Sequence, residues 1–437
     1  MLLLLLLASA LLSIPVQHVS ALPNPAVVAA PPAQFTANPS IGSGTGSYKD
    51  SAHFRVYPSD ADSDATLKML EAAHSCFVEG MGWRSPGLSY KNAASATETG
   101  PWYKTNVYKV EASAMPGAAA QTWTDANAGL AYLKVVKDYM TTPGVVVHEF
   151  GHAMTYSEKN WIDQTRTGAW WETIANFIAD MYIATPTCQA AKSAAGLPDG
   201  DTLIELKKVI GDSYQVLVDG TSGTGNYYQA WPFLSYITTN PDSYPGLGKE
   251  TIQNMIRKYK INSNETPLHS LERLLSSSSS SGGATIQKLV GRYWARMAYV
   301  DIGHAKAKAM FESQRKSLNY ANLDANGNGK WTVKSARAPR YMGASILPLK
   351  STGANVSVVV TASGGNFTAT LAVKGSGGGV RYMDLVNGSG SVALASGEEA
   401  TLVVANTPAL VQYDAFSIPA DVNKGLGFSV QVTGATA

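Results

Sequence analysis

The residues of this chain whose types and spacing best suggest chemistry lie in one apolar stretch, VVVHEFGHAM at positions 145–154. On an α-helix, residues four apart share one face, so His148 and His152 can direct both imidazoles at one point. Zinc favours such a pair, and Glu149 would lie beside the ion, where it can take a proton from a zinc-bound water. The His-Glu-x-x-His pattern therefore predicts a hydrolytic zinc site. The competing interpretation is two core histidines beside an incidental glutamate.

A third protein ligand would separate these two interpretations. In one class of zincins this ligand lies six residues after the second histidine and follows a glycine that breaks the helix. Here those positions hold Thr155 and Glu158. Without the glycine the helix continues, and six residues at about 100° each turn Glu158 to the far side from His152. Glu158 is therefore rejected as a ligand.

In another class the third ligand is a glutamate from a following helix. The segment GAWWETIANFIAD at positions 168–180 predicts such a helix, with Glu172 in its first turns. Asn176, one turn further on, lies on the same face, where its side chain is placed to hold His148 or His152 by a hydrogen bond.

These residues resemble the gluzincin metallopeptidases, whose thermolysin-like members share the His-Glu-x-x-His helix and a downstream helical glutamate ligand. The segments WWETIANF and NYYQAWPFLSYI look more particularly like a poorly characterised secreted zincin-like family of microbes. The resemblance extends over about residues 50–335 and is specific only between Val145 and Asp180. It implies a zinc peptidase whose metal and catalytic residues are His148, His152 and Glu172 as ligands and Glu149 as general base.

The chain departs from the thermolysin-like pattern one turn after the glutamate ligand, where those enzymes have an aspartate and this chain has Asn176. The amide oxygen of Asn176 can accept from an imidazole N–H but adds no negative charge, which predicts a less basic ligand. Asp180, one further turn on, is the other candidate for this supporting role. The implied reaction also needs a donor for the developing oxyanion. Tyr228 is the first candidate for this donor, and Tyr227 and His304 are the next candidates. Such residues more often pack in a core or lie at the surface.

The elements that must position these residues predict an α+β fold. Strand-like runs HFRVYPS, TNVYKVEA and GLAYLKVV, and a helical run ATLKMLEAAHSCFVEGM, precede the histidine helix, which Pro143 opens. We expect a zincin-like catalytic domain at residues 47–340, with a small β-sheet and a mainly helical part. GLAYLKVV is either the edge strand along which an extended substrate pairs or an ordinary interior strand.

After about Arg340 the hydrophobic pattern changes to a period of two, as in ANVSVVVTA, FTATLAVKG, ATLVVAN and GFSVQVTG. This pattern predicts a β-sandwich at residues 341–437. Its role is either to support the catalytic part or to bind carbohydrate. A second function class follows from the latter: a non-catalytic, zincin-shaped secreted protein that binds glycans or cell walls.

The first 21 residues, MLLLLLLASALLSIPVQHVSA, predict a secretory signal peptide, and residues 22–46 a flexible leader outside the fold. We therefore expect a secreted, extracellular protein. In that compartment Cys76 and Cys188 form either a single disulfide or two buried thiols. The sequence also contains four acceptor sites for N-glycosylation, at Asn264, Asn355, Asn366 and Asn387.

The near balance of charge, with a formal net charge of +2, gives no reason to expect nucleic acid or a membrane as partner. A protein, peptide or glycopeptide substrate fits the predicted chemistry equally well. The segment DANGNG at residues 324–329 resembles the first half of a calcium loop, with Asp324, Asn326 and Asn328 as ligands, but Ser335 replaces the glutamate expected at position twelve. A plain Asn-Gly turn is the favoured interpretation and a weak Ca²⁺ site the alternative.

Overall fold

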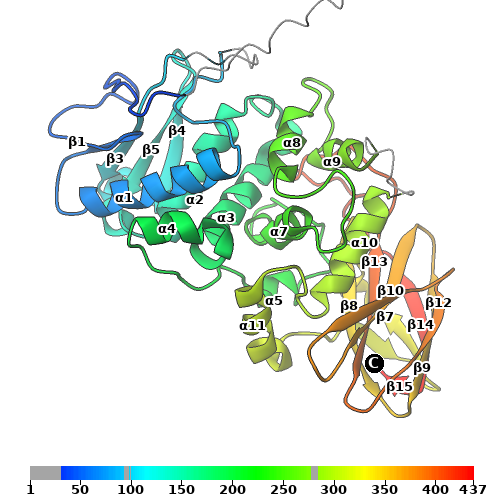
Figure 1. Cartoon of the computed structure of the whole chain (residues 1–437). Coiled ribbons are helices and arrows are strands. Elements are labelled where there is room, and N and C mark those ends of the chain that lie inside the picture. Colours follow the sequence, from blue (N-terminus) through cyan, green and yellow to red (C-terminus); the bar gives the residue numbers. More distant parts are fainter. Residues whose placement is uncertain (1–30, 93–97, 99, 277–283) are drawn as a thin grey trace, which may run out of the picture.

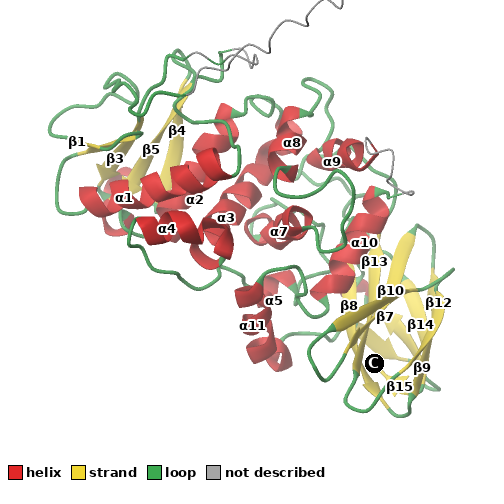
Figure 2. Ribbon diagram, viewed as in Figure 1, coloured by secondary structure: helices red, strands yellow, loops and turns green. Residues whose placement is uncertain are grey.

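The computed structural model describes residues 31–92, 98, 100–276 and 284–437. The predicted signal peptide and most of the serine-rich segment 276–283 lie outside the described residues. Helices and three five-stranded sheets make an α+β fold, as expected (Figures 1 and 2). No helix within the described part of the chain is both long and apolar enough to cross a membrane.

The N-terminal sheet has the strand order β1-β2-β3-β5-β4. Its strands are β1 Lys49–Asp50, β2 Phe54–Tyr57, β3 Thr105–Val110, β4 Ala120–Asp125 and β5 Leu130–Val136. Strands β2, β3 and β5 pair in parallel, whereas β4 runs antiparallel to β5. The segment GLAYLKVV is therefore the interior strand β5. The substrate-edge alternative was wrong for this strand, because β4 covers its outer side.

The N-terminal half also contains the helices α1 Ser63–His74, between β2 and β3, and α2 Pro143–Ser157, α3 Gly168–Ala184 and α4 Gln189–Ala194, which follow β5. Helix α2 packs against β4, β5 and α3. Pro143 occupies its first turn, as predicted, where a missing N–H costs nothing. Gly151 allows the close approach of α3, because a Cβ at this position would lie 3.1 Å from the Cα of Ala175. This contact fixes the two helices that carry the predicted ligands.

A disulfide joins Cys76, in the π-helical turn Ser75–Gly80 after α1, to Cys188, just before α4. Of the two alternatives drawn from the sequence, the disulfide is thus the one the structure contains. It ties the α1 region to the end of α3 across 112 residues of sequence. A link of this span stabilises the fold mainly by restricting the unfolded chain.

The middle of the chain is helical, as predicted. Its elements are α5 Leu206–Val209, α6 Asn226–Gln229, α7 Trp231–Thr239, α8 Thr251–Arg257, α9 Pro267–Ser276, α10 Ile286–Met297 and α11 Ala305–Gln314. Helix α10 packs on strands β10 and β13 of the C-terminal region. The helices and that sheet share one continuous hydrophobic core, to which Trp294, Ile346 and Val403 contribute.

Two antiparallel sheets form the C-terminal region, with orders β11-β10-β13-β8-β15 and β12-β9-β14-β7-β6. Their bounds are β6 Leu323–Ala325, β7 Lys330–Val333, β8 Ala344–Ser351, β9 Asn355–Ala362, β10 Phe367–Lys374, β11 Val380–Asp384, β12 Ser389–Ala393, β13 Glu399–Asn406, β14 Phe428–Thr433 and β15 Ala435–Thr436. Alternate residues of both sheets, among them Val358, Leu371 and Val430, share a second core. Because β6 and β7 belong to these sheets, the C-terminal region begins near Leu323, and the boundary predicted at residue 341 falls too late.

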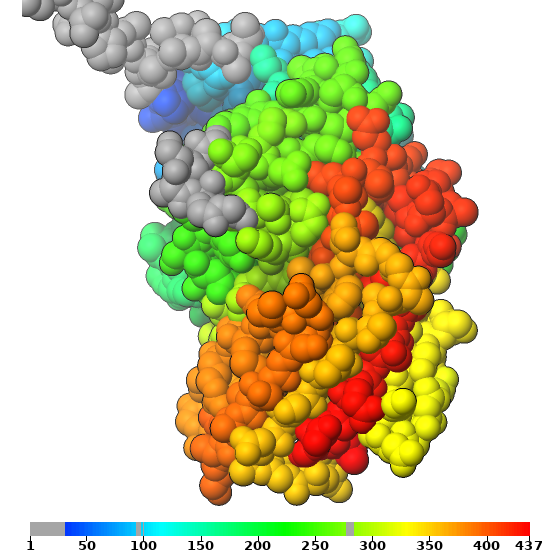
Figure 3. Space-filling model, turned by 90° about the vertical axis from the view of Figure 1, so that its right-hand side faces the viewer, coloured from blue at the N-terminus to red at the C-terminus, as the bar shows by residue number. Residues whose placement is uncertain are grey.

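The segment between β13 and β14 crosses back to the helical region, and Figure 3 shows it in orange-red against that surface. The Gly220 N–H donates to the Ala415 carbonyl at 2.9 Å, and the Tyr413 hydroxyl donates to the Val218 carbonyl at 3.3 Å. The C-terminal region is therefore attached to the residues that precede α6, in addition to its contact with α10.

The expectation that residues 22–46 lie outside the fold was wrong for their described part. Phe35 and Ile41 are buried, and Thr36 bridges to Tyr103. Ile41 packs with Tyr132 of β5, and its carbonyl accepts from the side chain of Asn106 at 2.9 Å. The apolar residues of this Pro- and Ala-rich segment were too sparse for a periodic pattern, but they cover sheet surface that the helices leave open.

Candidate metal centre

Three ligand atoms from two helices converge at one point. His148 Nε2 and His152 Nε2 of α2 lie 3.1 Å apart, and Glu172 Oε2 of α3 lies 3.1 and 3.3 Å from them. Zinc bonds of about 2.0–2.1 Å in a tetrahedron place ligand atoms about 3.3 Å apart. The observed spacing fits this requirement. The two imidazole planes make an angle of 81°, so that their nitrogens point toward a common site rather than past each other.

Asn176 holds the first histidine in the orientation that a metal ligand needs. Its Oδ1 lies 2.8 Å from His148 Nδ1, and its Nδ2 donates to the Tyr228 carbonyl at 2.6 Å. With the amide oriented by Tyr228, Nδ1–H of His148 must be the donor to Oδ1, which leaves the lone pair of Nε2 free toward the convergence point. The sequence prediction placed Asn176 in this role.

Asp180, the alternative for that role, has other partners. Its carboxylate accepts from the Thr202 hydroxyl at 2.7 Å and the Leu203 N–H at 2.6 Å, and lies 2.6 Å from His304 Nε2. This corrects two expectations at once, since His304 is buried against Asp180 and is not placed to stabilise an oxyanion. The reason lies in helix geometry: Asp180 is eight residues, or about 12 Å along the axis, beyond Glu172.

The electrostatics of the three residues favour an ionised Glu172 beside the two imidazoles. Burial alone would lower the pKa of His148, but the hydrogen bond to Glu172 and the charges of Glu149 and Glu172 raise it overall. For Glu172, burial acts to raise the pKa, and hydrogen bonds from both histidines outweigh it and hold the pKa well below its usual range. Glu172 is thus an anion with its charge directed at the two imidazoles, as a metal ligand requires.

The Glu149 side chain belongs to the same helix as the two histidines and is held by a hydrogen bond from strand β4. Thr122 of β4 donates from Oγ1 to Glu149 Oε2 at 2.7 Å, and the same hydroxyl lies 2.8 Å from the Glu149 carbonyl. The sequence analysis missed Thr122 because it missed β4: the segment AQTWTD carries too few apolar residues for a strand pattern. Its Thr and Trp content was the signal that could have identified a strand.

A cavity of about 420 Å³ opens over this centre. Strand β4 forms one wall, and Tyr156, Trp171 and Tyr228 contribute aromatic side chains. Tyr228 is 39% exposed, and its ring lies roughly parallel to that of His148, with centroids 6.5 Å apart. Burial and the charge of Glu172 raise the pKa of the Tyr228 phenol, which therefore stays a proton donor at neutral pH. Tyr227 does not line the cavity, and its ring packs against Tyr228 and Phe416.

A second group of residues, which the sequence analysis did not identify, also brings two histidines and a glutamate together: His53, His74 and Glu79. The two imidazoles are stacked, with centroids 3.8 Å apart and planes at 11°. His53 Nδ1 lies 2.6 Å from Glu71 Oε2. A metal bound to one ring lies in the plane of that ring, so stacked rings cannot both direct a lone pair at the same ion. This group is therefore the weaker metal candidate.

The remaining sequence candidates occupy turns or ion pairs. Glu158 binds Arg257 through both carboxylate oxygens, in line with its rejection as a ligand. The DANGNG segment forms the β6–β7 hairpin turn, the favoured interpretation, and the Asn326 side chain bonds to Thr332 within it. The weak Ca²⁺ site at Asp324, Asn326 and Asn328 stays an untested prediction.

A family model described as a family of unknown function, DUF6055, matches residues 42–391. This match spans well over half of the chain, and the protein belongs to this family. A search of curated proteins found no match. The matched range includes the candidate metal centre and ends within the C-terminal sheets.

Proposed function

We propose that this member of the family is a secreted zinc-dependent peptidase, with His148, His152 and Glu172 as the zinc ligands and Glu149 as the general base. One observation carries the proposal: two imidazole nitrogens and a carboxylate oxygen meet at tetrahedral spacing, while a second carboxylate stands beside them without joining them. Three protein ligands leave a fourth position for water, the arrangement of a catalytic rather than a structural zinc.

Zinc, when bound, would act as a Lewis acid toward a peptide carbonyl and lower the pKa of a bound water. In this scheme Glu149, oriented by Thr122, accepts the proton of that water and passes it to the leaving amine. Strand β4 is the free edge of its sheet beside the site, so its unpaired backbone groups are suited to pair with an extended peptide. The Tyr228 hydroxyl is our candidate donor to the developing oxyanion.

The arrangement of the helices and strands agrees with the proposed peptidase function. We interpret the N-terminal sheet with helices α2 and α3 as a zincin-like domain, and the two C-terminal sheets as a β-sandwich. The disulfide between Cys76 and Cys188 supports secretion, because such links persist in oxidising compartments and are rare in the cytosol.

Glu149→Gln tests the proposal, because glutamine keeps the size of the side chain and removes its basicity. We expect bound zinc to remain at one per chain while cleavage of a broad peptide library falls by roughly 10²- to 10⁴-fold, the usual value of general-base catalysis. The matched control is Glu79→Gln, which lies in the other histidine group and should cleave as the wild type does. Full turnover by the Glu149→Gln protein, or no turnover by the zinc-loaded wild type, would contradict the peptidase proposal.

A further inference from the structure

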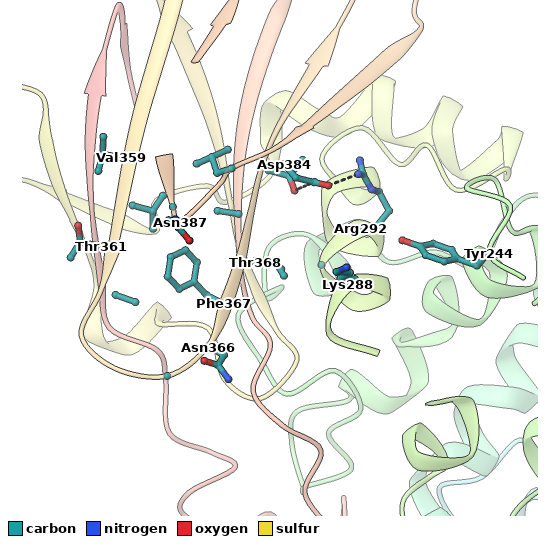
Figure 4. A pocket seen from close by; sticks show the side chains of 18 residues that line it. Tyr244, Lys288, Arg292, Val359, Thr361, Asn366, Phe367, Thr368, Asp384 and Asn387 are labelled. Atoms are coloured by element: carbon teal, nitrogen blue, oxygen red, sulfur yellow. Dashed lines mark hydrogen bonds and ion pairs between the residues drawn. The ribbon is translucent and has the colours of Figure 1, made fainter. Parts of the chain in front are cut away.

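A second cavity, of about 800 Å³, shares no lining residue with the cavity over the candidate metal centre. Helix α10 and Tyr244 form one side, and strands β9 and β10 with the β11–β12 turn form the other (Figure 4). Cavities at the junction of two regions are common ligand sites, and this volume lies within the usual range of about 300–1,000 Å³. Nothing in the proposed peptidase chemistry uses it.

Three charged side chains line this cavity: Lys288 and Arg292 of α10 and Asp384 of β11. Arg292 of α10 donates to Asp384 Oδ2 at 2.8 Å, the pair joined by a dashed line in Figure 4, and the Thr370 hydroxyl donates to Asp384 Oδ1, also at 2.8 Å. The Asp384 side chain is still 65% exposed, so that its oxygens have lone pairs left for a ligand. Because the exposed Asp384 carboxylate lies beside Arg292, the part of the cavity at this ion pair is a poor site for a phosphate or carboxylate. It suits a neutral ligand rich in hydroxyl groups, for which a paired donor and acceptor form two hydrogen bonds.

An apolar surface lies next to these polar groups. The half-buried ring of Phe367 lies in the lining, where its edge packs on Gly388: a Cβ on that glycine would come within 3.2 Å of it. Val359 of β9, in the other C-terminal sheet, also lines the cavity and exposes 46% of its surface. Figure 4 shows Phe367 between the amide side chains of Asn387 and Asn366. Aromatic and amide groups side by side match a sugar ring, which has an apolar C–H face and a rim of hydroxyls.

We propose that this cavity binds a neutral oligosaccharide, with Asp384 and Arg292 bonding to its hydroxyl groups and Phe367 packing on a ring face. The proposal goes beyond the peptidase function and does not depend on it. It gives the C-terminal sheets a binding role, located at their junction with α10.

The oligosaccharide has two conceivable sources. Asn366 and Asn387 are both acceptor sites for N-glycosylation, both are exposed, and both line this cavity. A glycan attached to either residue would start at the edge of the cavity, within reach of Phe367. The same chemistry would therefore serve a free glycan or the protein's own N-glycan, and the two sources require separate experiments.

For a free glycan, the full chain produced without N-glycosylation is titrated calorimetrically with neutral oligosaccharides of glucose, N-acetylglucosamine, mannose and xylose. We expect one of these classes to bind, and Asp384→Asn and Phe367→Leu each to weaken binding at least tenfold. Asp324→Asn, on the β6–β7 hairpin, is the matched control, since its side chain is 67% exposed. It should bind as the wild type does, as should Glu149→Gln, so that loss of peptidase activity and loss of glycan binding are separate results.

For an attached glycan, the chain is produced in a eukaryotic secretory host. We expect glycan at Asn366 or Asn387, and hydroxyl-radical labelling of Phe367 that rises severalfold after enzymatic removal of the glycan. Melting temperatures of all variants identify any that fail to fold. The proposal is overturned if the unmodified protein binds no oligosaccharide at millimolar concentration and Phe367 labelling is the same with and without glycan. If the protein binds an oligosaccharide and neither Asp384→Asn nor Phe367→Leu weakens that binding, the binding site does not lie in this cavity.

Discussion

Two histidine pairs in the N-terminal half of this protein have similar neighbours and opposite geometry. His148 and His152 meet with ring planes at 81° and share Glu172, whereas His53 and His74 stack at 11°. In both pairs one ring nitrogen lies within hydrogen-bonding distance of a carboxylate, that of Glu71 for His53 and that of Glu172 for His148. The comparison shows that similar residue types at similar proximity can be arranged very differently, and for a metal site more than type and proximity matters. The direction of the nitrogen lone pairs also matters, and that direction follows from the backbone that carries each ring.

The backbone explains the difference. His148 and His152 project from one helix at i and i+4, so their side chains leave the same face one turn apart and can tilt toward a point between them. His53 comes from the residue before β2 and His74 from the end of α1, two elements that pack face to face. Rings contributed by packed elements stack like any other aromatic pair, and Phe35 packs edge-on against both.

The largest effect should come from removing one ring from each pair. We expect His148→Ala to lose the bound zinc and all peptidase activity, because two protein ligands do not hold the ion. His53→Ala should keep one zinc per chain and wild-type turnover. Elemental analysis after dialysis, together with a peptide assay, measures both. If the His53→Ala protein lost zinc and the His148→Ala protein retained it, the zinc site would be the His53–His74 group instead.

The second prediction concerns acid stability, through His74. This ring is only 4% exposed and neither nitrogen has a hydrogen-bond partner. Burial lowers the pKa of His74 to about 3, and repulsion from His53 acts in the same direction. An unfolded histidine titrates near 6.5, so between pH 6.5 and 3 the unfolded state binds more protons and the free energy of unfolding falls as the pH falls. At about 1.4 kcal/mol per pKa unit the full effect is several kcal/mol.

Replacing His74 with phenylalanine isolates this contribution. His74→Phe keeps an aromatic ring among Phe35, Phe54 and His53 and removes both unpaired nitrogens. We expect its denaturation midpoint to exceed that of the wild type increasingly as the pH is lowered from 6.5. Equal slopes in the two proteins would show that His74 is not the group responsible. A second zinc equivalent that only the wild type binds would make the stacked pair a metal site after all.

The third prediction concerns the residues that orient the ligands. Asn176→Ala should weaken zinc binding by roughly 10- to 100-fold, the usual effect of losing a group that holds a metal-bound histidine. Asp180→Asn is the control on the same helix. It should leave zinc affinity unchanged and lower the melting temperature, because the buried carboxylate accepts from Thr202 and Leu203. Competition against a chelator of known affinity gives both constants.

The sequence predicted the parts of the site that depend on one helix at a time. The pairing of His148 with His152 and of Asn176 with Glu172 follows from the 3.6-residue period, Glu172 itself came from the resemblance to zincins, and the structure brings all four together. Asp180 was expected on the same face of α3 as Glu172, but it lies too far along the helix axis to reach the histidines. The 3.6-residue period indicates which face a residue occupies and not how far along the axis its partner lies. The convergence of α2 with α3 also depends on packing at Gly151, which no local pattern contains.

The features that the sequence missed depend on contacts between distant segments. Strand β4 has no apolar period, yet it forms a wall of the cavity because β5 pairs with it throughout. The short strand β7 joins the C-terminal sheets through its pairing with β14, about one hundred residues later in the chain, and β6 joins through β7. The buried Phe35 and Ile41 lie in a segment whose composition is that of a linker. In each case tertiary packing outweighs local preference.

The smallest expected effect tests whether the precise placement of Glu149 matters beyond its presence. Thr122→Val removes the hydroxyl that holds the Glu149 carboxylate and keeps the shape of the side chain. A hydrogen bond to a charged group contributes about 1.5–3 kcal/mol, and part of this is recovered from water in an open cavity, so we expect kcat to fall about tenfold with zinc content unchanged. Thr124→Val, on the same strand but with its hydroxyl beside Tyr156, is the matched control and should keep wild-type kcat. If KM rises instead and kcat is unchanged, Thr122 contributes to substrate binding along β4 and Glu149 is positioned by its helix alone.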